Sequence, residues 1–439
     1  MHIGIWCDYG FTLEPSEGIG VFVDNLARGL VRAESNCEIL LMAHPGQEAA
    51  LESTVAGGLG RISVTSGIKL SRSRRRVIRT LKRFRRRLGE PTADRRLAFR
   101  MDQWVKRRCD ALAAPAMIRS SSIIESCDLW LLPYVGLEQE FNRPTVVAIH
   151  DLVCYHFPEM MQPAKLEWLK RLVNRVSERA TIAACMSEFI RDHDLIGTLR
   201  LPEDRVRVIK AAVPDGFRQH GSVEESAATA ADSSAWLASL GIVGPYLFYP
   251  AAFRSYKNHR LLIDALRLLK GRSPLPWKVV FTGIQKCPSD LRSRISKLGL
   301  EGDVLILKKV TRAELQNLYR HAFATVVPSL YEQGSFPIME ALNCHCPVAA
   351  SDIPSLREQF SSMRDSMLYF DPRSPESLVP IVETILHNRQ SIIDAQQLGF
   401  AALRSYTWTD SAQGWLDVFR EAMQLPHGIA EVRHQCKAA

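Results

Sequence analysis

The segment Ala324-Thr-Val-Val327-Pro-Ser-Leu-Tyr-Glu332-Gln-Gly-Ser-Phe-Pro337-Ile-Met-Glu340-Ala-Leu342 contains a complete strand, loop and helix. Its first four residues form a short apolar run, as expected of a buried strand. Pro337 suits the first helical position, because its fixed φ is already helical and it lacks an N–H that would be left without a partner. Strands that alternate with helices in this way indicate a parallel α/β sheet.

The same alternation extends on both sides of this segment. Upstream of it, we predict strands over Tyr246–Tyr249, Val279–Thr282 and Val304–Leu307, with helices over Asn258–Lys270, Asp290–Leu298 and Thr311–His321. Thr311 and Glu314 form a capping box at the start of the last helix. The N-terminal half predicts strands over His2–Asp8, Ile39–Ala43, Leu129–Pro133, Val146–Ile149, Thr181–Cys185 and Val206–Ile209, and helices over Val21–Glu34 and Pro163–Arg179.

A polar stretch over 221–240 has few large apolar residues and divides the two alternations, so we interpret it as a linker. The 439 residues therefore predict two doubly wound Rossmann-like domains that face a central cleft, because ligands bind at the carboxyl ends of parallel strands. The predicted parts are a first Rossmann-like domain (1–220), the linker (221–240), a second Rossmann-like domain (241–405), a C-terminal helix (406–425) and a tail (426–439).

Positive charge is concentrated in one insertion. The chain has a net charge of +9, whereas residues 69–108 contain 17 basic and three acidic residues, a net charge of +14 that leaves −5 elsewhere. Apolar residues at helical spacing from Val77 to Leu88 predict a basic amphipathic helix that binds an anionic membrane surface. The alternative is a helix packed on its own domain. Nucleic acid is disfavoured as a partner, because no nucleic-acid-binding motif accompanies the charge.

The expected location is cytoplasmic, with a peripheral position at the inner membrane face through residues 69–108. No run approaches the roughly 18 apolar residues of a spanning helix, and the sequence from Met1 to Ile5 lacks the basic head of a signal peptide. The ten cysteines contain no Cys-x-x-Cys pair, and this usage fits a reducing compartment.

Two segments of the N-terminal half carry candidate binding groups. Gly18 and Gly20 precede the first predicted helix, where glycine permits close backbone approach and the helix N-terminus favours anions. His150 and Asp151 follow a buried strand, at the edge where a parallel sheet presents functional groups. Taken singly, the segment with Gly18 and Gly20 is also compatible with a plain glycine turn, and His150 is also compatible with a structural role.

The C-terminal half carries candidate groups for binding an anion. Lys257 follows the strand Tyr246–Tyr249, and a fixed cation there can stabilise negative charge that develops on a ligand. Glu332 and Glu340 are separated by seven residues around the start of a helix. Backbone N–H groups at such a helix start, those of Ser335 and Phe336, can bind phosphate oxygens.

Together these segments resemble the retaining glycosyltransferases of family 4, which have the GT-B fold. The resemblance implies that His150 faces the donor sugar and acceptor, that Lys257 holds the diphosphate, and that Glu332 and Glu340 contact the sugar and the ribose. Ala251-Ala252 departs from the Gly-Arg of the family, and Arg254 is the nearest cation that could replace this arginine. The predicted catalytic residues are His150, Asp151 and Glu332, and the predicted donor-binding residues are Gly18, Gly20, Arg254, Lys257, Gly283, Ser335, Phe336 and Glu340.

The resemblance implies transfer of a hexose with retention, without a metal or another cofactor. GDP-mannose is the first-choice donor, because the variant segments resemble those of bacterial polysaccharide mannosyltransferases; a UDP-sugar is the second. The expected acceptor is a glycan or a lipid-linked intermediate. Asp192-His193-Asp194 resembles a metal-binding Asp-x-Asp, but we place it on a surface helix and predict no metal site.

Two other classes of protein are alternatives to a glycosyltransferase. A nucleotide-dependent oxidoreductase would need Gly-x-Gly-x-x-Gly directly after a strand, and neither half contains it. A non-catalytic, membrane-associated scaffold on a glycosyltransferase fold stays open, because Ala251-Ala252 and Gln333 depart from the family pattern. The presence of Lys257, Glu332 and Glu340 argues against the scaffold.

Overall fold

The computed structural model describes residues 1–9, 18–44, 60–66, 122–135, 141–218, 227–283 and 286–425, with isolated residues at 48, 51, 52, 77, 80, 81, 101, 104 and 105. Almost all of the basic insertion at 69–108 lies outside these residues, and so does the tail at 426–439. Among the described residues, no helix is both long enough and apolar enough to cross a membrane.

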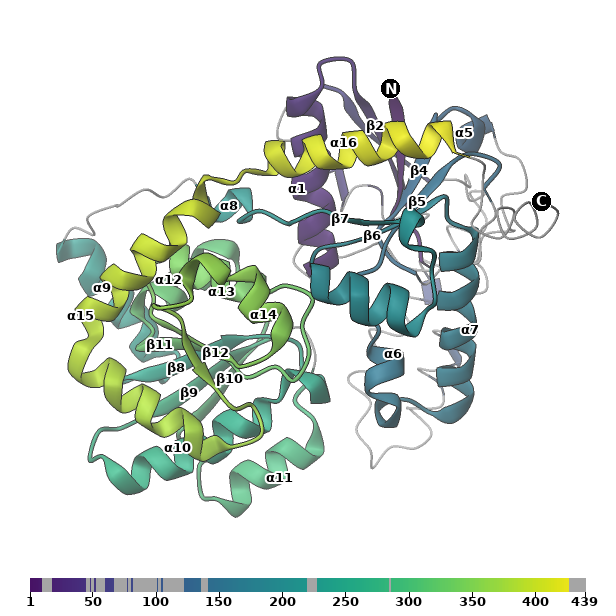
Figure 1. Ribbon diagram of the computed structural model, residues 1–439. Helices are drawn as coiled ribbons and strands as arrows, with labels where there is room; N and C mark the ends of the chain where they lie inside the picture. Colours follow the sequence, from purple (N-terminus) through teal and green to yellow (C-terminus); the bar gives the residue numbers. More distant parts are fainter. Residues whose placement is uncertain are drawn as a thin grey trace.

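The described strands form two parallel sheets, one in each half of the chain (Figure 1). The first sheet has the order β3-β2-β1-β4-β5-β6-β7, and the second has the order β10-β9-β8-β11-β12-β13. The first contains β1 (His2–Trp6), β2 (Glu38–Ala43), β3 (Ile62–Ser66), β4 (Leu129–Leu132), β5 (Thr145–Ala148), β6 (Ile182–Cys185) and β7 (Val206–Val208). The second contains β8 (Tyr246–Pro250), β9 (Lys278–Thr282), β10 (Val304–Leu307), β11 (Ala324–Val327), β12 (Val348–Ser351) and β13 (Leu368–Phe370).

Helices flank both sheets. Within 1–218 they are α1 (Gly18–Ala33), α5 (Ser122–Glu125), α6 (Val153–His156), α7 (Pro163–Arg179), α8 (Asp215–Arg218), the π-helix η2 (Ile190–Thr198) and the 3-10 turns η1 (Pro158–Met160) and η3 (Glu203–Arg205). From residue 227 onward they are α9 (Ala227–Ser239), η4 (Ser255–Lys257), α10 (His259–Arg272), α11 (Ser289–Lys297), α12 (Arg312–His321), α13 (Phe336–Asn343), α14 (Pro354–Gln359), η5 (Ser361–Met363), α15 (Pro375–Ser405) and α16 (Trp408–Gln424).

The first sheet buries both of its faces. Ile3 and Ile5 of β1 pack with α1 and α16 on one face, while Trp6 packs on the other. Gly4 lies beneath the Trp130 ring, and an added Cβ would lie 2.4 Å from a ring carbon. This position therefore requires glycine, because a side chain would push the ring away.

Helix α16 leaves the second domain and lies across α1 of the first, as Figure 1 shows in yellow and purple. Trp408, Trp415 and Phe419 are fully buried in the core that β1 and α1 share. An added Cβ at Gly29 of α1 would lie 2.4 Å from the Trp408 carbonyl oxygen, so glycine is what allows the two helices to approach so closely. The last helix is therefore part of the first domain's core.

Most of the strand and helix predictions are confirmed within one or two residues. The Thr311 capping box is present, since the Thr311 hydroxyl accepts from the Glu314 N–H and the Glu314 carboxylate accepts from the Thr311 N–H. The predicted linker is wrong in its second half, because Ala227–Ser239 form α9 and Leu237 packs in the second domain's core. The elements β3, β12, β13, α14 and α15 were not predicted.

Candidate active site

The two chain segments that carry the strongest motifs meet because β8 and β11 are neighbours in the second sheet. The Lys257 segment follows β8, and the Glu332 segment follows β11. The strand order reverses between these strands, which is where open α/β sheets bind ligands. Lys257 Nζ lies 2.6 Å from Glu332 Oε1, so two residues predicted separately form one ion pair.

A chain of buried hydroxyls holds the same oxygen of Glu332 that Lys257 contacts. The Ser329 hydroxyl donates to Glu332 Oε1 at 2.7 Å, and the Tyr249 hydroxyl lies 2.9 Å from Ser329 Oγ. Ser329 and Tyr249 are fully buried, whereas Lys257 retains 21% exposure of its side chain. The pair is therefore anchored in the second domain and open toward solvent at its cation.

Asn258 fixes the backbone that presents Lys257. Its φ of 54° is left-handed, a conformation that asparagine tolerates better than most residues. Its Nδ2 donates to the carbonyls of Pro328 at 3.0 Å and Pro372 at 2.7 Å. One side chain thus ties the loop after β8 to the loops after β11 and β13.

We expect Asn258→Ala to destabilise the protein by about 1–3 kcal/mol, because two carbonyls lose their donor and alanine is strained at this φ. Asn258→Gly loses the same hydrogen bonds without the strain, so it should lie between wild type and Asn258→Ala. Denaturant unfolding of the three proteins gives the order. Equal stability of wild type and Asn258→Ala would show that these bonds do not hold the loop.

His150 and Asp151 approach the cleft from the first domain, directly after β5. Burial lowers the pKa of His150 to about 4, so its ring is neutral at neutral pH. Its Nε2 is buried and has no hydrogen-bond partner among the described residues. Asp151 is open to the solvent of the cleft. Desolvation by the surrounding protein nevertheless raises the pKa of its carboxyl. The Val153 N–H, Arg254 and Lys257 lower this pKa by less.

The two domains touch through the Glu332 segment. The Gln333 side chain donates to the carbonyl of Ile149 at 2.6 Å, and the Leu152 N–H donates to the Tyr331 hydroxyl at 3.0 Å. These contacts flank His150 and Asp151 on one side of the cleft and Glu332 on the other. The domains are thus held close enough for both sets of groups to reach one ligand.

The cleft has a volume of about 730 Å³. Ten of the eleven predicted site residues line it: Gly18, Gly20, His150, Asp151, Arg254, Lys257, Gly283, Glu332, Phe336 and Glu340. An added Cβ at Gly283 would lie 3.0 Å from the Ala251 carbonyl oxygen, so this glycine permits a close approach of two loops.

Ser335 is the predicted site residue that does not line the cleft. Its N–H donates to Gln359 Oε1 at 2.8 Å, and its role in phosphate binding stays a prediction. Helix α13 begins one residue earlier than predicted, with Ser335 at the N-cap and Phe336 as its first residue. Glu340 consequently lies in the second turn of the helix.

Glu340 is a buried carboxyl in the lining of the cleft. The Tyr319 hydroxyl donates to its Oε2 at 2.9 Å. Burial raises the pKa of Glu340 to about 7, and the Tyr319 hydrogen bond and the Arg312 charge lower it by less. This carboxyl therefore changes its charge within the physiological pH range.

Two family models match the two halves of the chain. Glycosyltransferase Family 4 matches residues 16–216, and Glycosyl transferases group 1 matches residues 239–402. The chain belongs to the family 4 glycosyltransferases. Its fold is that of the GT-B members: Anabaena HepE in complex with UDP-glucose superposes with a TM-score of 0.64 at 15% identity, over 96% of this chain and 100% of HepE.

The curated relatives of this glycosyltransferase include O-antigen chain mannosyltransferases and D-inositol 3-phosphate glycosyltransferases. O-antigen chain mannosyltransferase B of Escherichia coli is 23% identical over 63% of this chain and 70% of its own length. O-antigen chain mannosyltransferase RfbU of Salmonella typhimurium is 30% identical over 55% and 61%. A D-inositol 3-phosphate glycosyltransferase of Jonesia denitrificans is 24% identical over 40% and 43%.

Some residues of the glycosyltransferase cleft were not predicted. Lys309 and Arg312 line it beside Arg254 and Lys257, at the end of β10 and the start of α12. Tyr331 was not predicted as a site residue, although its hydroxyl accepts the cross-domain hydrogen bond from the Leu152 N–H. A basic residue after a strand of a parallel sheet is the one local signal that could have pointed to Lys309.

The prediction that Asp192-His193-Asp194 lies on a surface helix is wrong for Asp194. Asp192 is exposed and pairs with Arg191, but Asp194 has no exposed surface. Asp194 is covered because η2 faces α6 and the Tyr331 segment of the second domain. The polar spacing of the segment gave no indication of these distant neighbours.

Proposed function

We propose that this chain transfers a hexose, with mannose favoured, from a nucleotide-sugar to a glycan or lipid-linked acceptor, with retention of the anomeric configuration. The Lys257–Glu332 pair in a cleft that His150 and Asp151 also line carries this proposal. The O-antigen mannosyltransferases among the relatives support GDP-mannose as donor. The HepE complex makes a UDP-sugar the second choice.

The second domain supplies the groups suited to the donor. Arg254, Lys257, Lys309 and Arg312 give the cleft positive charge, which can offset a diphosphate without a bound cation. We therefore propose metal-independent transfer. Glu332, held by Ser329 and Lys257, is placed to accept hydrogen bonds from sugar hydroxyls, and Glu340 to accept them from the ribose.

The reaction we propose occurs on one face of the sugar. The bond from the anomeric carbon to the diphosphate oxygen breaks, the acceptor oxygen attacks from the same side, and the leaving diphosphate takes the acceptor's proton. Lys257 and Arg254 stabilise the charge that develops on the diphosphate. The neutral His150 ring, which lines the cleft, orients sugar or acceptor hydroxyls rather than adding charge.

Thermal shift across GDP, UDP, ADP and their sugars, without and then with magnesium, tests the donor. One nucleotide that stabilises the protein without metal identifies the base. Transfer from the matching nucleotide-sugar, with the product anomer read by NMR, then tests retention. Binding without transfer to glycan and lipid-linked acceptors would favour the non-catalytic scaffold instead.

The membrane partner is tested separately from catalysis. We propose that residues 69–108 bring the enzyme to an anionic bilayer, since their net charge is +14 in an otherwise acidic chain. Deleting 69–87 should abolish sedimentation with vesicles rich in anionic lipid and leave nucleotide binding unchanged. Vesicle binding that survives this deletion would contradict the assignment.

We expect donor affinity to fall about tenfold from pH 8 to pH 6. Burial places the pKa of Glu340 near 7, and only the ionised carboxylate accepts two ribose hydrogen bonds, so affinity is lost as the pH falls through 7. A nucleotide-sugar is used for the titration, because the terminal phosphate of a free nucleoside diphosphate itself has a pKa of about 6. Glu340→Gln should bind more weakly with no such pH dependence. A wild-type affinity that stays flat from pH 6 to pH 8 would contradict the role of Glu340.

A further inference from the structure

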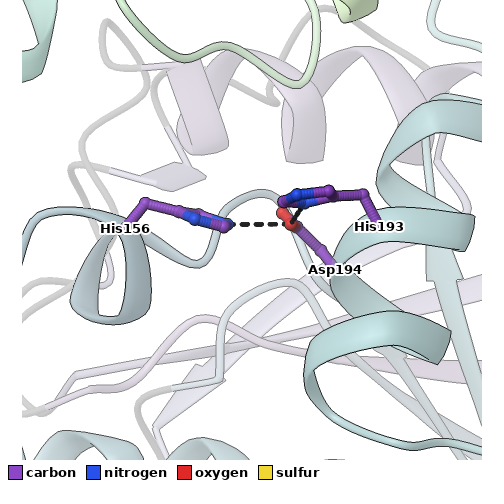
Figure 2. A group of neighbouring side chains, drawn as sticks. All are labelled: His156, His193 and Asp194. Atoms are coloured by element: carbon purple, nitrogen blue, oxygen red, sulfur yellow. Dashed lines mark hydrogen bonds and ion pairs between the residues drawn. The ribbon is translucent and has the colours of Figure 1, made fainter.

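A fully buried carboxylate lies outside the donor cleft, where the two domains meet. Asp194 of η2 has no exposed surface. Its Oδ1 lies 2.8 Å from His156 Nε2 and 2.8 Å from His193 Nδ1, so both rings converge on one oxygen (Figure 2). The Tyr331 hydroxyl donates to Oδ2 from the second domain.

This carboxylate requires positive charge that no lysine or arginine supplies. Within the described part of the chain, no lysine or arginine forms an ion pair with it. A buried carboxylate without a cation is costly, so either a protonated imidazole or a bound metal ion must balance it.

The three side chains have the geometry of a metal-binding set. Their ligand atoms all lie within 4.8 Å of one another. Zinc bonds of about 2.0–2.1 Å in a tetrahedron place ligand atoms about 3.3 Å apart. Each 2.8 Å contact would therefore lengthen by about half an ångström, and the wider separations, of up to 4.8 Å, would shorten. Two imidazoles with one carboxylate suit zinc and its neighbours better than magnesium or calcium, which prefer oxygen.

The surroundings orient the ligands and leave a route for an ion. The His193 ring stacks on Phe189 with centroids 5.1 Å apart, and the His156 ring lies 4.8 Å from that of Tyr331. Hydrogen bonds to a ligating carboxylate, as from Tyr331, are usual around metal sites. The His193 side chain is 53% exposed, so water can reach the cluster and fill a fourth position. The π-helical form of η2 is rare, and such turns occur often at functional sites.

We propose that His156, His193 and Asp194 bind one divalent transition-metal ion of the zinc type, with water as the fourth ligand. Coordination needs His156 Nε2 and His193 Nδ1 without protons; a neutral ring moves its proton to the other nitrogen, and an imidazolium releases it to solvent. None of the three residues lines the donor cleft, so this site is separate from the proposed metal-independent transfer. Through Tyr331, the ion would hold the Glu332 segment against the first domain.

Cobalt binding to the full-length protein tests the site. The purified protein is stripped with a chelator and titrated with Co²⁺, and the visible absorption of tetrahedral cobalt is followed, then its loss as Zn²⁺ displaces it. We expect one ion per chain. His193→Ala and His156→Ala should each weaken cobalt binding at least about 10–100-fold. Losses of metal affinity of this size are already typical when a residue that only hydrogen-bonds to a metal ligand is replaced. His193 is chosen first because its side chain is half-exposed.

His387→Ala is the matched control, because His387 is an exposed histidine of α15 outside the cluster. It should bind cobalt as wild type does. In a thermal melt, zinc should stabilise wild type and His387→Ala but not His193→Ala. The proposal is overturned by absence of the cobalt band, by unchanged affinity in His193→Ala, or by an intense near-ultraviolet thiolate band that would place the metal on cysteine. Donor binding is not a readout here, so failure of this site leaves the proposed function intact.

Discussion

Lys257→Ala is expected to lower kcat/KM by about 10²–10³-fold, the effect typical of removing one fixed group that stabilises developing charge. The variant loses one of the cations that line the cleft and that we propose hold the diphosphate. It also leaves Glu332 without its 2.6 Å ion-pair partner, which adds uncompensated negative charge to the cleft. The measurement is initial-rate kinetics with the nucleotide-sugar that stabilises the protein most.

The control for this loss is Lys308→Ala, since Lys308 is an exposed lysine that does not line the cleft. It should keep wild-type activity. Because Lys257 and Glu332 touch, the double variant Lys257→Ala/Glu332→Gln should lose less activity than the product of the two single losses. Full activity in Lys257→Ala, or strictly multiplicative losses, would mean that the pair does not act as a unit in transfer.

Lys257 and Glu332 show how far sequence reasoning about the site reaches. Each residue is predicted from its own segment, through the resemblance of that segment to the family pattern. Their contact follows from the pairing of β8 with β11, which brings together segments 75 residues apart. The parallel-sheet prediction implied such neighbours, but strand order is set by tertiary packing.

Asp194 shows where the same reasoning fails. Its partners His156 and Tyr331 lie 38 and 137 residues away, so nothing in the polar segment around it indicates burial. Gln359, which takes the Ser335 N–H, is similarly 24 residues away. Sites assembled from separate elements of two domains leave no periodic pattern, and only the folded arrangement identifies them.

The fold itself was predictable where local signals agree. The strand Ala324–Val327 has the predicted bounds, because a β-branched apolar run is followed at once by Pro328. The strand β12, Val348–Ser351, has two alanines and one serine, residues with weak preference for strands. It forms because pairing with β11 and β13 buries it completely.

The last helix gives the largest expected effect on stability. Trp415→Ala should lower the free energy of unfolding by about 3–5 kcal/mol, because it empties a fully buried position between α16 and Phe22 of α1, whose ring centroid lies 5.6 Å away. At about 2–4 °C per kcal/mol for domains of this size, the melting temperature should fall by at least about 6 °C.

Met423→Ala is the matched control. Met423 belongs to the same helix but is 38% exposed, so its replacement should cost little stability.

The first domain should be the part that loosens in Trp415→Ala, because α16 packs in the core of that domain although it follows the second domain in the chain. Protease digestion of Trp415→Ala should therefore cut first within the N-terminal half. Equal melting of both variants, or first cleavage in the second domain, would mean that α16 does not stabilise the first. Helix α16 begins directly after the second domain's α15, so this one helix also ties the two domains together. Transfer needs both domains at the cleft. Loosening α16 should therefore weaken donor binding less than it lowers the rate of transfer.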